Sequence, residues 1–211
     1  MIDYFLHALV TLFVTIDPIG LAPMFMVVTA GFGPAARRET AIRAAVTATA
    51  VLIAFALVGE PLLTFLGISL PAFRIAGGLL LFTIAFEMVF ERRTERKAAQ
   101  VEPDRIEDRR HVAIFPLAIP LTSGPGAISA TILLASQAPG IGALIGLLVV
   151  VVLMVGVCLA VFLLAGPIER ALGETGRLVV SRLLGVLLAA LSVQFVADGI
   201  LAIARTGWPG N

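Results

Sequence analysis

The sequence predicts an all-α membrane protein with six transmembrane helices arranged as two inverted three-helix repeats, whose first and fourth helices are broken near the midplane. Three observations predict this fold class. Of the 211 residues, 59% are hydrophobic and only 14% are charged, with a mean hydropathy of +1.05. Six apolar runs are long enough to cross a bilayer. Features of the first half of the chain also recur at a nearly constant distance in the second half.

The six expected spans cover residues 4–30, 41–59, 71–90, 112–136, 140–165 and 180–204. Residues 91–111 form the one long polar connection, with seven basic and six acidic residues. Because these charges nearly cancel, we expect a solvated linker. It would separate a first repeat at 1–90 from a second at 112–211.

The basic residues predict the orientation of the chain in the membrane. With six spans, thirteen of the fifteen Lys and Arg residues fall on one side and only Arg74 and Arg205 on the other. Cytoplasmic loops carry the excess of Lys and Arg in membrane proteins. The linker at 91–111 is therefore predicted to be cytoplasmic and both termini outside. The net charge of +1 indicates no nucleic-acid partner.

Several sequence features support an internal repeat. Pro18 corresponds to Pro125, Thr15 to Thr122 and Gly67 to Gly173, with almost the same separation in each pair. Each repeat contains three spans, and an odd number gives the second copy the opposite orientation. Inverted repeats of this kind place their binding site near the midplane, commonly at broken helices.

The predicted breaks are Asp17-Pro18-Ile19-Gly20 in the first span and Thr122-Ser123-Gly124-Pro125-Gly126 in the fourth. Proline removes a backbone hydrogen bond and glycine permits non-helical angles. Unpaired backbone groups cannot face lipid, so they must be buried in protein or line a wet cavity. A half-helix that begins at Pro18 or Pro125 offers free N–H groups to a carboxylate. The freed carbonyl groups suit an ammonium group, so a small zwitterion matches both.

Asp17 is the most informative single residue because a charged side chain inside the membrane is costly. Its role is left open between a ligand for an ammonium group or cation, a proton carrier, and a cap on the half-helix, including a purely structural cap. The residues predicted to bind substrate are Asp17, Pro18, Gly20, Thr122, Ser123, Gly124, Pro125, Gly126 and Gln194. Weaker candidates for coupling or gating are Thr15, Glu87 and Ser129. No metal-ligand cluster and no nucleophile–base pair is visible, so the sequence predicts neither a metal site nor an enzyme.

The motifs Asp-Pro-Ile-Gly-Leu-Ala-Pro at 17–23 and Pro-Leu-Ala-Ile-Pro-Leu-Thr-Ser-Gly-Pro-Gly-Ala-Ile-Ser at 116–129 resemble those of the MarC (UPF0056) family. The resemblance covers nearly the whole chain. It implies a six-span protein of the cell inner membrane, related to the LysE-like transporters, and some members are described as transporters of glycine and alanine. One position departs from the pattern, because Leu21 stands where the family commonly has Asn.

The residues and the resemblance together predict a secondary transporter of small zwitterionic solutes, such as neutral amino acids, that works by alternating access. The alternatives are a cation channel or exchanger that uses the same breaks, and a membrane scaffold that transports nothing. No cofactor is expected, and a coupling ion, H+ or Na+, is left open. The expected partners are the lipid bilayer and a small-molecule substrate, with homo-oligomerisation left open.

Overall fold

The computed structural model describes residues 1–90 and 113–206, and all the elements in these ranges are helical. The predicted linker at 91–111 lies outside the described residues. The helices are α1 (Ile2–Ile16), α2 (Pro18–Val28), α3 (Pro34–Phe65), α4 (Leu70–Val89), the π-helix η2 (Ala113–Thr122), α7 (Pro125–Ser136), α8 (Ile141–Leu163) and α9 (Ala165–Thr206).

Five segments of the described chain are long and apolar enough to cross a membrane. They are Ile2–Val28, Pro34–Phe65, Leu70–Val89, Ile141–Leu163 and Thr175–Arg205. The run expected as the fourth span is divided here between η2 and α7, and α7 is a shorter apolar helix of 12 residues. The protein is therefore an all-helical membrane protein built on about five long apolar helices.

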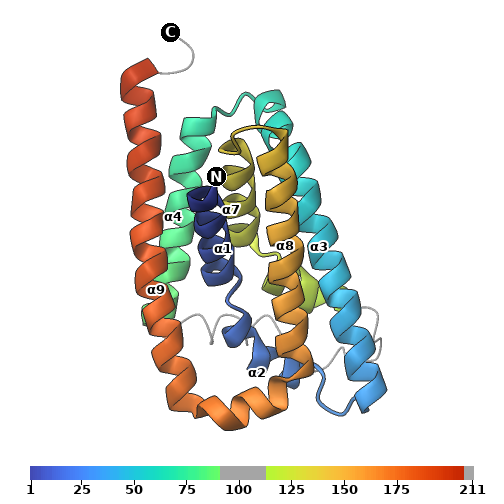
Figure 1. The fold of residues 1–211 in the computed structure, drawn as a ribbon. Coiled ribbons are helices and arrows are strands. Elements are labelled where there is room, and N and C mark those ends of the chain that lie inside the picture. The colour runs from blue at the N-terminus through green and yellow to red at the C-terminus, as the bar shows by residue number, and fades with distance from the viewer. Residues whose placement is uncertain (91–112, 207–211) are drawn as a thin grey trace.

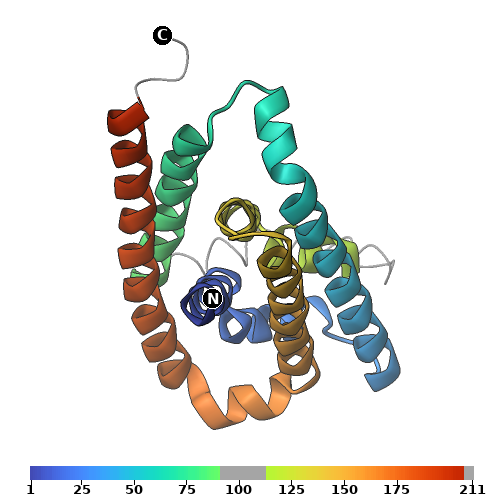
Figure 2. The ribbon, with the colours of Figure 1, turned by 45° about the horizontal axis from the view of Figure 1, so that its top comes forward.

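The helices form an outer ring around a central core. The helices α4 and α9 pack against each other on one side and α3 and α8 on the other, with α1 and α7 between the two pairs (Figures 1 and 2). The span that contains α1 is the most buried of the five. In the most apolar stretch of Ile2–Val28, 67% of the residues are buried, against 22–33% in the other four candidate spans. The segment that contains the first predicted break thus lies inside the bundle, and α7, which follows the second break, is buried over most of its length.

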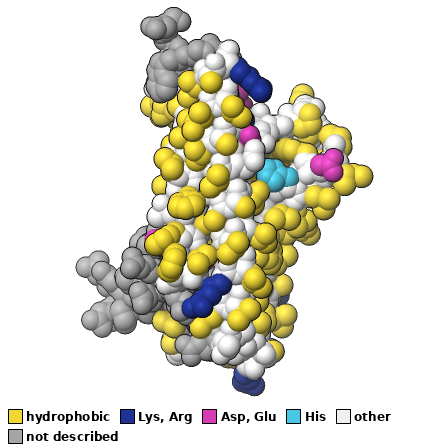
Figure 3. Space-filling model, turned by 90° about the vertical axis from the view of Figure 1, so that its left-hand side faces the viewer, with side chains coloured by type: hydrophobic (Ala, Val, Ile, Leu, Met, Phe, Trp, Pro, Cys, Tyr) yellow, Lys and Arg dark blue, Asp and Glu magenta, His cyan; other side chains and the backbone are white. Residues whose placement is uncertain are grey.

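The outer surface is suited to lipid. Large hydrophobic side chains such as Leu79, Phe86, Val149, Leu183 and Val193 are exposed on α4, α8 and α9. On the face viewed in Figure 3, hydrophobic side chains dominate and the Lys and Arg side chains lie near the two ends. Exposed apolar area of this extent is unusual in a soluble monomer and is expected of a bilayer-embedded surface.

Glycines bring α4 and α9 into close contact at three points, at Gly78, Gly185 and Gly199. A Cβ atom built on Gly78 would lie 2.8 Å from the Ser192 carbonyl oxygen and 2.8 Å from Val196 Cγ2. A Cβ atom on Gly185 would lie 3.2 Å from the Ala85 carbonyl oxygen and 3.0 Å from the side chain of Val89. Small residues permit this approach of helix backbones in membrane proteins.

We expect Gly78→Ala and Gly185→Ala each to destabilise the protein, because the new methyl group would push α4 and α9 apart. Overpacking of this kind costs about 1–3 kcal/mol. The cost corresponds to a fall in melting temperature of several degrees, at roughly 2–4 °C per kcal/mol for a chain of this size.

A thiol-reactive dye can report unfolding, because Cys158 is the only cysteine and is fully buried. Gly156→Ala in α8 is the control, since no atom lies within 4 Å of that Cβ position. Equal melting curves for Gly78→Ala and Gly156→Ala would contradict the expected close packing.

Candidate functional site

Asp17 forms the junction between α1 and α2. Its backbone is left-handed, with φ 56° and ψ 66°, and among the described residues it is the one non-glycine residue with positive φ. Asp and Asn adopt this conformation more readily than most residues. The turn ends α1, and Pro18 then begins α2 with its fixed φ, which suits a first helical position. The sequence Asp-Pro therefore stops one helix and starts the next within a single residue.

The side chain of Asp17 caps the N-terminus of α2. Its Oδ1 accepts a hydrogen bond from the Gly20 N–H at 3.0 Å, and the residue is only 3% exposed. A Cβ atom at position 20 would overlap Asp17 Oδ2 and lie 2.8 Å from Cγ, so the carboxylate would have to shift to make room for any other residue. The sequence leaves several roles open for Asp17, and this hydrogen bond is direct evidence for one of them, the helix cap. Leu21, which follows, is fully buried in the core.

The second junction, at Ser123 and Gly124, is built differently. The preceding η2 is a π-helix, and the Ser123 N–H donates to the Ala118 carbonyl, five residues back, at 2.9 Å. The hydroxyl groups of Thr122 and Ser123 donate to the carbonyl groups of Leu117 and Ala118, each at 2.8 Å. Both side chains are buried, at 1% exposure. Their hydroxyl protons are thus used by the local backbone, while their oxygen lone pairs can still accept.

The N-terminus of α7 lacks the cap that α2 has. Gly124 is its N-cap residue, with extended backbone angles and no side chain to accept a hydrogen bond, and Pro125 follows at the first helical position. Within the described part of the chain, neither the Gly126 N–H nor the Ala127 N–H has a recorded acceptor. Such N–H groups, with the positive end of the helix dipole, form an anion-binding arrangement.

The two junctions are neighbours in the folded protein. A Cβ atom on Gly126 would lie 3.4 Å from Thr15 Cγ2, so the end of α1 contacts the start of α7. Thr15 is 3% exposed, and its hydroxyl donates to the Thr11 carbonyl at 2.5 Å. The helix α2 also contacts η2. The fold therefore brings together two motifs that lie in different halves of the sequence. Asp17, Ser123 and Gly126 are buried there, Gly20 and Gly124 are partly buried, and Pro125 is exposed.

The remaining predicted residues lie on other helices or farther along α7. Ser129 is buried on α7, with its Cβ 3.5 Å from a Cβ position on Gly77 of α4. Glu87 is half-buried near the end of α4. Gln194 has an exposed side chain on α9, and its amide donates to Asp198 Oδ1 at 2.8 Å. No recorded contact within the described residues joins Gln194 to either junction, so its role in substrate binding stays a prediction.

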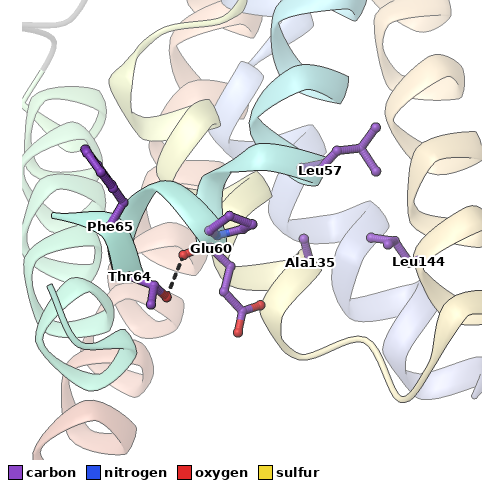
Figure 4. A pocket seen from close by; sticks show the side chains of 8 residues that line it. Leu57, Glu60, Thr64, Phe65, Ala135 and Leu144 are labelled. Atoms are coloured by element: carbon purple, nitrogen blue, oxygen red, sulfur yellow. Dashed lines mark hydrogen bonds between the residues drawn. The ribbon is translucent and has the colours of Figure 1, made fainter. Parts of the chain in front are cut away.

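Two cavities that the sequence motifs do not predict lie at opposite ends of the antiparallel α3–α8 pair. One has a volume of about 710 Å³, and Glu60, Thr64 and Leu144 are among its lining residues (Figure 4). The Thr64 hydroxyl donates to the Glu60 carbonyl oxygen at 3.0 Å. The other cavity has a volume of about 380 Å³ and is lined in part by Arg37 and Arg38. Sequence motifs miss such cavities because their walls come from several separate segments.

Comparison with known proteins agrees with this architecture. The model of the MarC family of integral membrane proteins matches residues 2–204. The UPF0056 membrane protein YhcE of Escherichia coli is 36% identical over 192 residues, which cover 91% of this chain and 89% of the relative. The UPF0056 membrane protein MJ1677 of Methanocaldococcus jannaschii is 34% identical over 199 residues, which cover 94% and 97%.

A relative from Aquifex aeolicus, also a UPF0056 membrane protein, is 33% identical over 196 residues, which cover 93% of this chain and 92% of the relative. No solved structure gives a significant match. The family model spans nearly the whole chain, and these three relatives align over about nine tenths or more of it. The chain therefore belongs to the MarC family of multi-pass integral membrane proteins.

Proposed function

We propose that this protein is a secondary transporter of small zwitterionic solutes, such as the neutral amino acids glycine and alanine, that works by alternating access. The substrate would bind between the junction at Asp17–Gly20 and the junction at Ser123–Gly126. Asp17, Ser123 and Gly126 are buried, and the two junctions contact each other through Thr15 and Gly126. Broken helices at the interface of two halves are the common substrate site of secondary transporters.

The observation that carries this proposal is the difference between the two half-helices. In α2 the first-turn N–H of Gly20 is bonded to the Asp17 carboxylate, whereas the first turn of α7 has no carboxylate at its N-cap position, Gly124. Gly124 is the counterpart of Asp17, because each directly precedes the proline that begins its half-helix. A substrate carboxylate would take at α7 the place that the Asp17 side chain takes at α2. The Gly126 and Ala127 N–H groups would be its donors, since the Ser123 hydroxyl already donates to Ala118.

The amine of the substrate, or a coupling ion, would be held at the first junction. Asp17 supplies a carboxylate that is 3% exposed, and a buried negative charge favours a nearby cation. Backbone carbonyl groups freed by Pro18 add acceptors on the same side. In this proposal Thr15, Ser129 and Glu87 act in coupling or gating, and the coupling ion is H+ or Na+.

The close contacts between α4 and α9 support an inverted repeat. Gly78 packs against Ser192 and Val196, and Gly185 packs against Ala85 and Val89. The separation along the chain from Gly78 to Gly185 is the same as that from Ala85 to Ser192 and from Val89 to Val196. Each contact is therefore the counterpart of the other when the two halves are exchanged, which is the relation expected of a two-fold axis between repeats. We propose that the repeats at 1–90 and 112–211 rock against each other about this axis.

The two cavities agree with the same relation. Arg37 lines the smaller cavity, and Leu144, its counterpart at that same separation, lines the larger one. Ala56 in the larger cavity and Leu163 in the smaller one are related in the same way. We propose that the two cavities lie on opposite sides of the membrane, with the Arg37 side cytoplasmic and both termini outside.

Exchange of labelled glycine or alanine in proteoliposomes tests the proposal. We expect saturable uptake that depends on unlabelled amino acid inside, and competition by neutral amino acids but not by glycinamide, which lacks the carboxylate. Empty liposomes are the matched control. Voltage-driven cation flux without saturation by amino acids would instead indicate a channel. No exchange of any small amino acid, together with no thermal stabilisation by them, would leave the scaffold as the better description.

A further inference from the structure

The smaller cavity, which we name the basic cavity, has features that the transport proposal does not use. It lies where α2 and α8 end and where α3 and α9 begin, and its lining includes Phe25, Phe32, Arg37, Arg38 and Phe162. Its volume of about 380 Å³ falls within the range of about 300–1,000 Å³ usual for small-ligand sites. The buried rings of Phe25 and Phe162 form its apolar floor, and Arg37 and Arg38 form a cationic rim.

The floor of the basic cavity is aromatic and rigid. The rings of Phe25 and Phe162 stack with centroids 4.8 Å apart and planes 12° apart. Both residues are nearly fully buried, at 3% and 2% exposure, and belong to the hydrophobic core. The ring pair therefore joins the end of α2 to the end of α8 and gives the cavity a fixed apolar wall.

The rim of the basic cavity carries two guanidinium groups. Arg37 is oriented by its Nε–H, which donates to the Thr29 carbonyl at 3.3 Å. Arg38 has no recorded hydrogen bond or ion pair within residues 1–90 and 113–206. Arg43, farther along α3, is by contrast paired with Glu39 at 2.6 Å. The cationic charge that faces the cavity is thus carried by Arg37 and Arg38.

The start of α3 adds to the positive potential. Gly33 caps this helix without a side-chain hydrogen bond, so its first N–H groups and the helix dipole act in the same sense as the two arginines. The larger cavity at the other end of α3 and α8 is different. Leu144 stands there at the position equivalent to Arg37, and the charged side chain in its lining is the acidic Glu60. The cationic character therefore belongs to one end of the bundle, which is the end predicted to be cytoplasmic.

We propose that the basic cavity binds the phosphate group of an anionic glycerolipid from the cytoplasmic leaflet. The phosphate accepts hydrogen bonds from Arg37 and Arg38, as in basic pockets between transmembrane helices that hold lipid head groups. The start of an acyl chain lies against Phe25, Phe32 and Phe162. A lipid fits better than a free anion because the cavity opens at the ends of membrane-length helices and its floor is aromatic. The inference does not depend on what the protein transports.

Native mass spectrometry and dye-monitored melting of the purified protein test this inference. Short-chain phosphatidylglycerol is titrated against phosphatidylcholine with the same acyl chains and against inorganic phosphate. We expect phosphatidylglycerol to be retained and to raise the melting temperature, with the other two having little effect. Arg37→Gln/Arg38→Gln should weaken phosphatidylglycerol binding at least about tenfold, since charge-assisted hydrogen bonds are lost. Arg43→Gln is the matched control and should bind as the unmodified protein does.

The inference is overturned by any of three results. Equal binding of phosphatidylglycerol and phosphatidylcholine would show that the charge has no role. Equal protection by inorganic phosphate would show a site for soluble anions. Undiminished phosphatidylglycerol binding by Arg37→Gln/Arg38→Gln would place the lipid elsewhere. Should that double variant not fold, Arg38→Gln alone gives the same test with a smaller expected loss, because no recorded bond in the described part of the protein depends on this side chain.

Discussion

Gly124→Asp should abolish amino-acid exchange and leave the protein as stable as before or slightly more stable. The backbone at Gly124 is extended, with φ −72° and ψ 171°, which an N-cap Asp adopts without strain. The new carboxylate would accept the N–H groups at the start of α7, as Asp17 does at the start of α2. An Asp cap is worth a few tenths of a kcal/mol over Gly. The same carboxylate would occupy the place proposed for the substrate carboxylate, so exchange should fall to the level of empty liposomes.

Gly124→Ala is the matched control for this experiment. Alanine adds a methyl group at the same position but no acceptor, so the α7 N–H groups stay available and exchange should persist. Measurement of exchange and of the melting temperature on both variants separates a filled site from a damaged fold. Normal exchange by a well-folded Gly124→Asp variant would exclude the α7 N-terminus as the carboxylate site.

Asp17→Asn should lose most of the exchange activity while keeping most of the stability, whereas Asp17→Ala should lose both. Asparagine keeps an oxygen that can accept the Gly20 N–H, and it tolerates the left-handed backbone at this position. It removes only the negative charge that we propose for the amine or coupling ion. Alanine removes the cap, at about 0.5–2 kcal/mol, and is less suited to positive φ. The melting temperature of Asp17→Ala should therefore fall by several degrees.

Gly20→Ala tests the same cap from its other side. The added methyl group would overlap the Asp17 carboxylate, so the variant should lose stability in the presence of Asp17. In the Asp17→Ala background the same change should be neutral or stabilising, because alanine is favoured over glycine in a helix by up to about 1 kcal/mol.

The exchange assay on Asp17→Asn decides between the two roles of Asp17. If this variant exchanged amino acids as the unmodified protein does, Asp17 would be a structural cap and the proposed role of its charge would be wrong.

The motifs around Asp17 and Gly124 are visible in the sequence because their chemistry is local. Proline cannot donate a backbone hydrogen bond wherever it stands, and an Asp before it can end one helix and cap the next. The turn at Asp17 follows from these properties. The π-helix of η2 does not, because the widening of a helical turn depends on what packs around it, and prolines at 116, 120 and 125 are compatible with several kinds of break.

The sequence by itself determined that this chain is a helical membrane protein, since several runs of about 20 apolar residues with few charges match the thickness of a bilayer. It also determined which residues interrupt the helices. Only the tertiary structure decided that Thr15 contacts Gly126, that Gln194 is turned outward to Asp198, and that Arg37 and Arg38 line the same cavity as an aromatic pair. These are contacts that the chain makes only once it is folded, and apolar sequences carry little information on which faces of their helices pack together.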